Sequence, residues 1–526
     1  MKFSREFLEK IEKMDPVDRP MIHKDHKMKS RRDFLAHGFM SSFGFTLAPS
    51  ILSLMRSDLA MAAEGCNNDA PVSTKTPLLI IDLAGGNMMA GNHMIVGANS
   101  QDSLDGINYS GFGYPDDISP SLNPGLINRD FNVAMNANST VLAGMQDATA
   151  TIRQSDSNFL SKVDGGFIAA QSENDRSTNP LNPVYWIAKA GASGTLTNTS
   201  GTNGGSSGGR SVPPAASVDP ILSPVQIGRV NDLTNLINLG VVQDQFGSNG
   251  IPKVQRTLAA LEKMSESKIN KFSNQTLSEQ LQQISECGYD TTRYTSQTAN
   301  PGAIDPQQDA QITRHYNGGE NSRNRNNYNP DASSAEACIV KALVDGMVGV
   351  GTIVLGGYDY HGNDRGTQDE KDYKVGRTIG RALSVAAEKN KPLMILVITD
   401  GGVTTSTTLQ PGQDGVMKYR YSGDNSSRGG AMTFIYNPVI ANPGDSIRAN
   451  SGRQIGEFTT VGQVDRTTGS LIQATGQNIN GNFAAVVAAN YLALHGEEAN
   501  FLNVVGDTYQ AIQNDLDRYL LFKPAA

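Results

Sequence analysis

The stretch PLLIIDLAGG, residues 77–86, is the clearest indicator of the fold. Seven nearly all-apolar residues run into a glycine pair, a pattern typical of a strand buried on both faces of a parallel sheet. Three more short runs of β-branched or apolar residues end in a glycine or a turn, and we expect them to be strands as well: residues 140–144, 352–356 and 393–399.

Segments with helical spacing of apolar residues alternate with these runs. Strand–helix alternation predicts an α/β fold in which a mostly parallel sheet is covered by helices on both faces. Two polar stretches, rich in Gly, Ser, Thr or Asn, interrupt it as predicted irregular insertions at residues 195–217 and 296–333. The predicted helices are residues 254–284, 334–348, 369–389, 482–494 and 508–520.

The N-terminal region has the three parts of a bacterial export signal in order. Ser30, Arg31, Arg32, Phe34 and Leu35 match the twin-arginine signature. A mildly apolar, uncharged stretch follows at residues 38–55, and a small-residue cleavage site follows at 59–63. We therefore expect a signal peptide over residues 1–63, the twin-arginine export machinery as a partner, and a periplasmic or secreted domain over 64–526. The alternatives are a chance arginine pair before a core helix, or an uncleaved leader that anchors the chain in the membrane.

Composition excludes some partners and leaves the cysteine chemistry open. The leader holds 11 of the 44 Lys and Arg residues and 8 of the 52 Asp and Glu residues, so the remainder has 33 against 44, a net charge of −11. This charge argues against nucleic acid as a partner. Cys287 and Cys338 are either a disulfide, which an oxidising compartment permits, or free buried thiols.

Acidic residues cluster where the predicted strands end. Asp82 closes the first strand, Asp359 and His361 follow the 352–356 strand, and Asp400 follows the 393–399 strand. Parallel strands present their carboxyl ends at one edge, where α/β proteins bind ligands. Clustered carboxylates with a histidine suit one divalent metal such as zinc, manganese or calcium. The alternative is that each Asp caps a helix or fixes a loop.

The order of these motifs resembles an exported bacterial family called domain of unknown function 1501. The motifs are LIIDLAGGN (residues 79–87), GGYDYH (356–361) and ITDGG (398–402), and Asp424 lies in a weaker fourth match. That family is itself similar to the alkaline phosphatase and sulfatase superfamily. The resemblance implies an alkaline-phosphatase-like architecture and, as metal ligands, Asp82, Asp359, His361, Asp400 and Asp424.

Departures from the superfamily pattern leave two functions open. Beyond the leader the chain has four histidines, and only His361 lies in a matching motif. No serine or threonine stands out as a nucleophile, although Ser100 and Ser103 follow the first strand at a plausible distance. One hypothesis is a metal-dependent hydrolase of a phosphate or sulfate ester with an incomplete metal site. The other is a non-catalytic binding or structural protein of the cell envelope on the same scaffold.

Overall fold

A computed structural model describes most of the chain from residue 75 onward. The described residues are 75–170, 181–202, 224–235, 301–318, 330–360, 362, 364–424, 428–462 and 479–524, with a few positions between 256 and 266. The chain divides into a unit of residues 1–48 and a unit of residues 49–526, and every described residue belongs to the second. Within the described part, no helix combines the length and apolar character of a membrane span.

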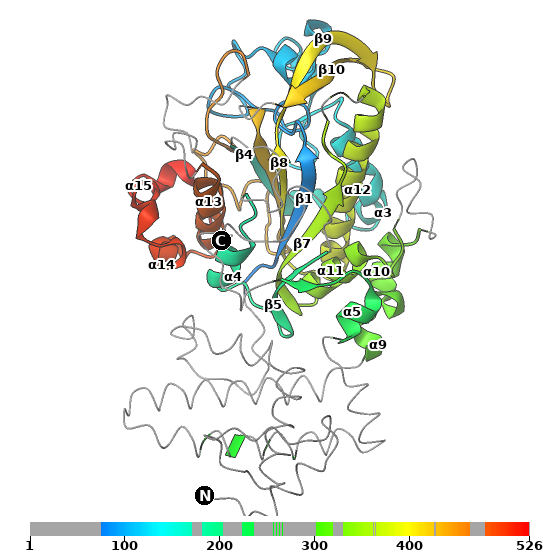
Figure 1. Ribbon diagram of the computed structural model, residues 1–526, viewed down its shortest axis with the longest axis vertical. Helices are drawn as coiled ribbons and strands as arrows, with labels where there is room; N and C mark the ends of the chain where they lie inside the picture. The colour runs from blue at the N-terminus through cyan, green and yellow to red at the C-terminus, as the bar shows by residue number, and fades with distance from the viewer. Residues whose placement is uncertain are drawn as a thin grey trace, which may run out of the picture. The chain divides into compact units, whose positions relative to one another are not determined.

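An eight-stranded mixed sheet forms the centre of this unit (Figure 1), in the order β12-β4-β11-β8-β1-β7-β5-β6. Five of its seven strand pairs are parallel, and only β11 runs antiparallel to its neighbours, β4 and β8. The strands are β1 (Leu78–Gly86), β4 (Val163–Ala169), β5 (Thr197–Gly201), β6 (Val225–Gln226), β7 (Val348–Gly356), β8 (Leu393–Gly401), β11 (Gly430–Tyr436) and β12 (Gln454–Ile455).

Helices cover both faces of the sheet, as Figure 1 shows. The sheet face on which a Gly351 side chain would point packs against α11 (Ala335–Val344). Helices α3 (Thr140–Ser155) and α12 (Arg365–Glu388) lie on this same side of the sheet. The neighbouring residue Thr352 points to the opposite face, where it accepts a hydrogen bond from Asn182 just before α4 (Val184–Lys189); α13 (Ile479–Leu494) lies on that side. The predicted α/β class, with a mostly parallel sheet between helices, is therefore confirmed.

Shorter elements complete the described part. Two small hairpins pair β2 (Ile127–Asn128) with β3 (Met135–Asn136), and β9 (Val403–Pro411) with β10 (Met417–Asp424). The short α-helices are α5 (Val230–Asn235), α9 (Pro301–Ile304), α10 (Ala310–His315), α14 (Phe501–Val505) and α15 (Gln510–Gln513). The 3-10 helices are Tyr109–Phe112, Asp116–Ile118, Pro124–Leu126, Leu160–Lys162, Pro306–Gln308, Glu498–Asn500, Asp507–Tyr509 and Leu516–Tyr519.

The segment 140–144, predicted as a strand, is instead the first turn of α3. The Ser139 side chain caps this helix by accepting a hydrogen bond from Leu142 N at 3.2 Å. The buried residues then recur at helical spacing, at Val141, Met145 and Ile152. The prediction was wrong because a short apolar run does not by itself distinguish a strand from a helix.

Three other sequence predictions need correction. Part of the predicted insertion 195–217 is strand β5, which pairs with β7, and the insertion 296–333 contains α9 and α10. Four of the five β5 residues are buried despite their polar composition, so polarity alone did not indicate an exposed insertion. The predicted helix 508–520 is broken into α15 and two 3-10 helices. The predicted helix 254–284 lies largely outside the described residues.

Cys338 is a free thiol buried in α11, and burial raises its pKa to about 12. The free-thiol alternative therefore holds for Cys338, whereas Cys287 lies outside the described residues.

Candidate functional site

The main chains after β1 and β7 are joined at the carboxyl edge of the sheet. Tyr358 N donates to the Ala84 carbonyl at 3.0 Å, and Tyr360 N donates to the Gly86 carbonyl at 3.2 Å. Gly85, between these two carbonyls, has a positive φ of 106°, and a Cβ atom there would lie 2.4 Å from Asp359 N. Only glycine allows this approach, so the glycine pair holds the 358–360 segment against the end of β1.

Strand β8 is joined to the same junction from the other side of β1. The Thr399 hydroxyl donates to the Gly85 carbonyl at 2.6 Å, and Gly401 lies opposite Gly86. The ends of β7, β1 and β8 therefore meet as adjacent parallel strands, as the sequence predicts. We call residues 84–87, 356–360 and 399–401 the strand-end junction.

Asp82 lies inside β1 rather than at its end. The strand continues through Gly86, and Asp82 is completely buried opposite Val354 of β7 and Ile398 of β8. Because side chains alternate along a strand, Asp82 shares the α4 and α13 face with Thr352 and not the α11 face. The prediction that Asp82 closes the strand is wrong, because the apolar-to-glycine transition does not mark the last paired residue.

The other predicted metal ligands are described to different extents. Asp359 is half-buried in the strand-end junction. His361 lies outside the described residues, and so do the side chains of Asp400 in β8 and Asp424 in β10, whose main chains are described. Within the described residues, no group of three or more His, Cys, Asp or Glu side chains is placed to hold a metal ion.

The other three histidines beyond the leader are buried and used in packing contacts. His315 contacts Glu388 at 3.4 Å, and His495 Nε2 accepts a hydrogen bond from Thr76 N at 3.0 Å. His93 contacts Asp372 and Ser139. Burial lowers the pKa of both His315 and His495, which favours their neutral forms. None of these three rings lies in the strand-end junction, so they do not supply it with the extra ligands of a two-metal centre.

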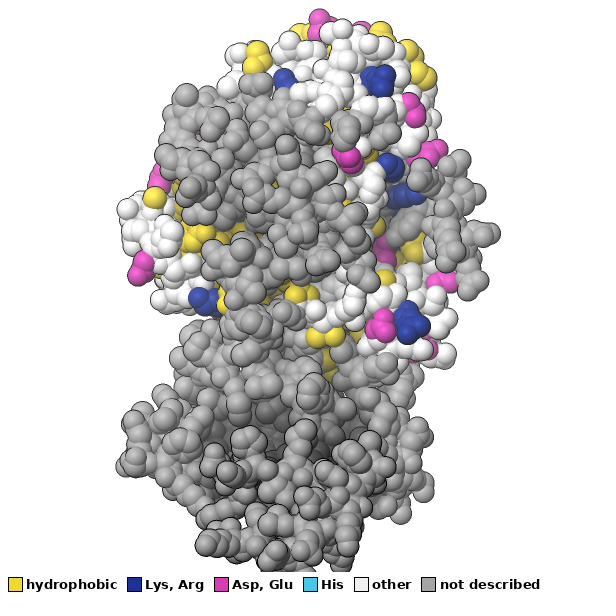
Figure 2. Space-filling view, in the orientation of Figure 1, with side chains coloured by type: hydrophobic (Ala, Val, Ile, Leu, Met, Phe, Trp, Pro, Cys, Tyr) yellow, Lys and Arg dark blue, Asp and Glu magenta, His cyan; other side chains and the backbone are white. Residues whose placement is uncertain are grey.

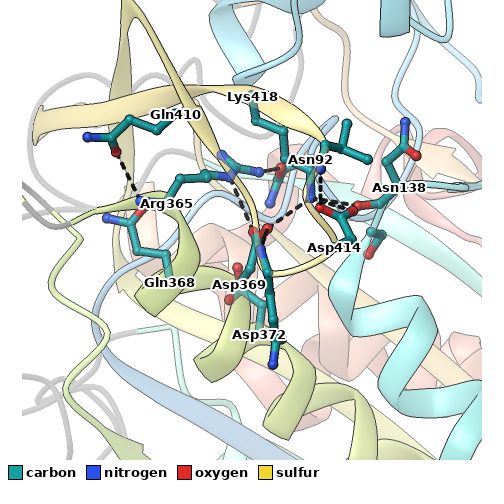
Figure 3. A network of polar contacts seen from close by, with 12 residues as sticks. Asn92, Asn138, Arg365, Gln368, Asp369, Asp372, Gln410, Asp414 and Lys418 are labelled. Carbon is teal, nitrogen blue, oxygen red and sulfur yellow. Dashed lines mark hydrogen bonds and ion pairs between the residues drawn. The ribbon is translucent and has the colours of Figure 1, made fainter. Parts of the chain in front are cut away.

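A buried polar network lies under the junction, on α12, and Figure 3 shows its central part. Asp372 accepts hydrogen bonds at Oδ1 from Asn87 (2.9 Å) and from the Tyr360 hydroxyl (2.8 Å). Its Oδ2 lies 3.1 Å from His93 Nε2. Burial alone raises the pKa of Asp372, but the His93 ring and the two hydrogen bonds outweigh it and hold this pKa below its ordinary value. Asp372 thus ties α12 to the residues that follow β1 and β7.

One helical turn earlier, Asp369 is the second centre of this network. Its carboxylate accepts from Arg365 Nε at 3.2 Å and from Lys418 Nζ at 2.9 Å. Arg365 also donates to Asn92 Oδ1 at 2.5 Å and stacks on the Tyr421 ring, with its guanidinium carbon 4.4 Å from the ring centroid. We call the Asp369 and Asp372 contacts together the α12 network. Because these charges are fully buried and paired, they fix the β9–β10 hairpin on α12.

Two large apolar side chains are exposed on this hairpin, among mostly polar neighbours. Leu409 is 46% exposed and Met417 is 45% exposed, although both belong to large apolar types. In Figure 2, hydrophobic side chains gather at the upper right, where Figure 1 places the hairpin.

Ser139, His93 and Asp372 are ordered like the nucleophile, base and acid of a hydrolase. His93 Nδ1 lies 2.9 Å from Ser139 Oγ, and Nε2 lies 3.1 Å from Asp372. However, the exposed fractions of the three are 2%, 1% and 0%, and Ser139 Oγ already caps α3. A nucleophile must reach its substrate, so this arrangement has a packing role. No local sequence pattern indicates this arrangement, since its members lie up to 279 residues apart.

The two serines that follow the first strand at a plausible distance, Ser100 and Ser103, lie away from the junction. Their hydroxyls are 2.8 Å apart, and Ser100 packs against Gly452, just before β12. In the sheet, β12 is four strand spacings from β1, about 19 Å. Ser100 and Ser103 are therefore not placed to attack a ligand at the ends of β1 and β7.

Comparison of the chain with family models, with curated proteins and with solved structures finds no match in any of the three. The α/β class consequently stands on the structure, and the family resemblance remains an expectation from the sequence motifs.

Proposed function

We propose that the strand-end junction binds one divalent cation and the anionic group of a phosphate or sulfate ester, and that the protein hydrolyses such esters. The scaffold would be alkaline-phosphatase-like, and the cation zinc, manganese or calcium. The observation that carries this proposal is the direct pairing of β7, β1 and β8, which brings the main chains of residues 359 and 400 to one edge.

The position of the junction agrees with how open α/β sheets bind ligands. In such sheets the ligand lies beyond the carboxyl ends of the strands. Asp359 is accessible there, and the main chain under it is held by Gly85 and the α12 network. The proposed ligands are Asp359, His361 and Asp400, with Asp82 and Asp424 as further candidates.

The roles of the residues follow from the chemistry of ester hydrolysis. A cation bound by these ligands would polarise the ester oxygen and lower the pKa of a water molecule. The protein would orient the ester over the rigid edge, and water would be the nucleophile, since Ser100 and Ser103 lie elsewhere. Three buried histidines engaged in packing limit the proposal to a single cation.

Turnover of a chromogenic phosphate ester and a chromogenic sulfate ester, with and without a chelator, tests this proposal. We expect chelator-sensitive hydrolysis that falls about 100-fold or more in the Asp359→Ala/His361→Ala variant. Asp517→Ala is the control, because the Asp517 side chain is 91% exposed and pairs with Arg448 at the surface. Hydrolysis that is equal in all three proteins would contradict the proposal.

A non-catalytic envelope protein is the second candidate, and one observation favours it. Among the described residues, no serine, threonine or additional histidine at the junction is placed as a nucleophile or metal ligand: Thr399 is buried and donates to Gly85. Cation binding without turnover of either ester would favour this second function.

We include export by the twin-arginine machinery in this proposal. That machinery carries proteins that have already folded, as a protein with a bound cation would have to. The double variant Arg31→Lys/Arg32→Lys should remain in the cytoplasm, whereas the wild type should be found in the periplasm or medium on cell fractionation. Equal distribution of both proteins would contradict export by this pathway.

A further inference from the structure

Two buried tyrosines lie on either side of Asp359 in the strand-end junction. Tyr358 is 2% exposed and Tyr360 is 0% exposed, and their ring centroids are 5.7 Å apart, so both rings lie on the same side of the main chain. Their amides bond to carbonyls two residues apart in β1, the pattern of an extended segment. Successive side chains of such a segment point to opposite sides, so Asp359 points away from the two buried rings.

One stretch of α12 holds both tyrosines by hydrogen bonds. The Tyr358 hydroxyl donates to the Lys371 carbonyl at 2.8 Å, and the Tyr360 hydroxyl donates to Asp372 Oδ1 at 2.8 Å. Gln368, one helical turn before Asp372, donates from its side chain to the Tyr360 carbonyl at 2.9 Å. The segment 358–360 is therefore attached to a long helix as well as to β1.

The Tyr360 hydroxyl shares its acceptor with the end of β1. Asn87, the residue after β1, donates to the same Oδ1 of Asp372 at 2.9 Å. His93 Nε2 lies 3.1 Å from the other oxygen, Oδ2, and so holds the carboxylate in place. One oxygen atom thus sets the distance between the residues that follow β1 and β7.

The Tyr360 ring makes a third contact. It stacks on Tyr421 of the β9–β10 hairpin, with ring centroids 5.8 Å apart and ring planes at 13°. Tyr360 consequently contacts β1 through its amide, α12 through its hydroxyl and the hairpin through its ring. A variant that lacks only the hydroxyl keeps the amide and ring contacts, so the contribution of the hydroxyl can be measured by itself.

We propose that Tyr360 is a positioning residue, whose hydroxyl fixes the main chain that carries two proposed cation ligands, Asp359 and His361. This rests on the proposed function. The Tyr360 side chain is fully buried and does not reach the ester or the cation, so it acts through its two neighbours in the chain. Ligands that are held in place before the cation arrives lose less conformational entropy on binding, which raises the affinity.

Cation titrations of chelator-treated protein with zinc, manganese and calcium test this role. Tyr360→Phe should bind the cation about tenfold more weakly than the wild type, the effect of losing one buried hydrogen bond to a charged group. Tyr491→Phe is the matched control. Tyr491 is equally buried, and its hydroxyl donates to the Thr76 carbonyl at 2.8 Å, before the amino end of β1. The control should lose similar thermal stability and keep the wild-type affinity.

Hydrogen exchange of the cation-free proteins measures the same role independently of binding. Peptides that contain the amides of Tyr358 and Tyr360 should exchange about tenfold faster in Tyr360→Phe than in the wild type or in Tyr491→Phe. Peptides from β8 should exchange equally in all three proteins. If Tyr360→Phe does not fold, Asp372→Asn replaces the charged acceptor with a neutral one of the same shape, and it should speed this exchange about threefold.

The two readouts separate the failure of this proposal from the failure of the proposed function. Wild-type exchange of these peptides in Tyr360→Phe, or in Asp372→Asn where that variant is needed, would overturn the role of Tyr360. Cation binding by the wild type with unchanged affinity in Tyr360→Phe would overturn it as well. A wild type that binds none of the three cations, although exchange depends on the Tyr360 hydroxyl, would refute only the proposed cation site.

Discussion

Two arginines near the carboxyl edge of the sheet occupy opposite environments. Arg365 is 1% exposed, pairs with Asp369, donates to Asn92 and stacks on Tyr421. Arg428 is half-buried, and within the described part of the chain it donates a hydrogen bond to the Val461 carbonyl at 3.3 Å.

The contrast is between an arginine that a carboxylate of the chain pairs and one for which the described residues supply no carboxylate. In the α12 network Asp369 and Asp372 have their cations and donors within the chain. Each of the two arginines has one buried nitrogen without a hydrogen-bond partner among the described residues, Nη1 of Arg365 and Nε of Arg428. Burial and charge are present at both arginines, and pairing with a carboxylate is what differs.

The largest expected effect is on the α12 network. Asp369→Ala leaves the buried cations Arg365 and Lys418 without their shared carboxylate, and it should lower the free energy of unfolding by about 3–5 kcal/mol. Urea unfolding followed by circular dichroism measures this. In the control, Asp414→Ala, Lys418 keeps Asp369, and the loss should be about 0–1 kcal/mol. Equal effects of the two variants would show that the network is not a paired structural unit.

The next effect concerns the glycine pair. Gly85→Ala combines a positive φ with a Cβ atom 2.4 Å from Asp359 N, and it should lower the free energy of unfolding by about 2–4 kcal/mol. Gly356→Ala is the control, since a Cβ atom there meets nothing within 4 Å. Thermal unfolding of both variants checks this, and a Gly85→Ala protein as stable as Gly356→Ala would mean that the junction is not tightly held.

A pH series tests whether Asp372 is a paired charge. Its pKa is lowered in the folded protein, so its contribution to stability is complete above the unfolded value of 3.8 and is lost as the pH falls below it. The stability difference between the wild type and Asp372→Asn, from urea unfolding at pH 3 to 7, should therefore be largest at the upper end and shrink toward pH 3. A difference that grows on acidification would contradict the assigned pairing.

The smallest expected effect is at Arg428. Arg428→Gln removes a partly desolvated charge that has no carboxylate partner among the described residues, so the free energy of unfolding should change by less than about 1 kcal/mol. Arg365→Gln, measured alongside by urea unfolding, should be far more damaging. A loss at Arg428 as large as at Arg365 would identify Arg428 as a structural residue.

The sequence predicted the layers of the fold better than its polar interior. Runs such as 78–83 and 393–399 are strands because continuous apolar character requires burial on both faces, and α11, α12 and α13 follow from helical spacing, although α12 begins at Arg365, before the predicted start at 369. The start of α3, residues 140–144, was predicted as a strand because a short run of β-branched and apolar residues fits either structure.

Of the candidate site, only the meeting of the three strand ends was predictable. The topology of parallel strands brings the ends of β1, β7 and β8 together, and this followed from the order of the motifs. The sequence did not predict that Asp82 is buried within β1. The strand pairing continues through Gly85 and Gly86, although a glycine pair usually marks a turn. The α12 network joins His93, Asp372 and Lys418 from distant parts of the chain, and no local sequence pattern predicts such contacts.

The metal content of the purified protein tests the central claim most directly. We predict about one equivalent of zinc, manganese or calcium in the wild type, measured by inductively coupled plasma mass spectrometry. The bound metal should be lost in Asp359→Ala/His361→Ala but retained in Asp517→Ala. A wild type without bound metal after purification and after incubation with each of the three ions would contradict the claim that the strand-end junction is a metal-dependent site.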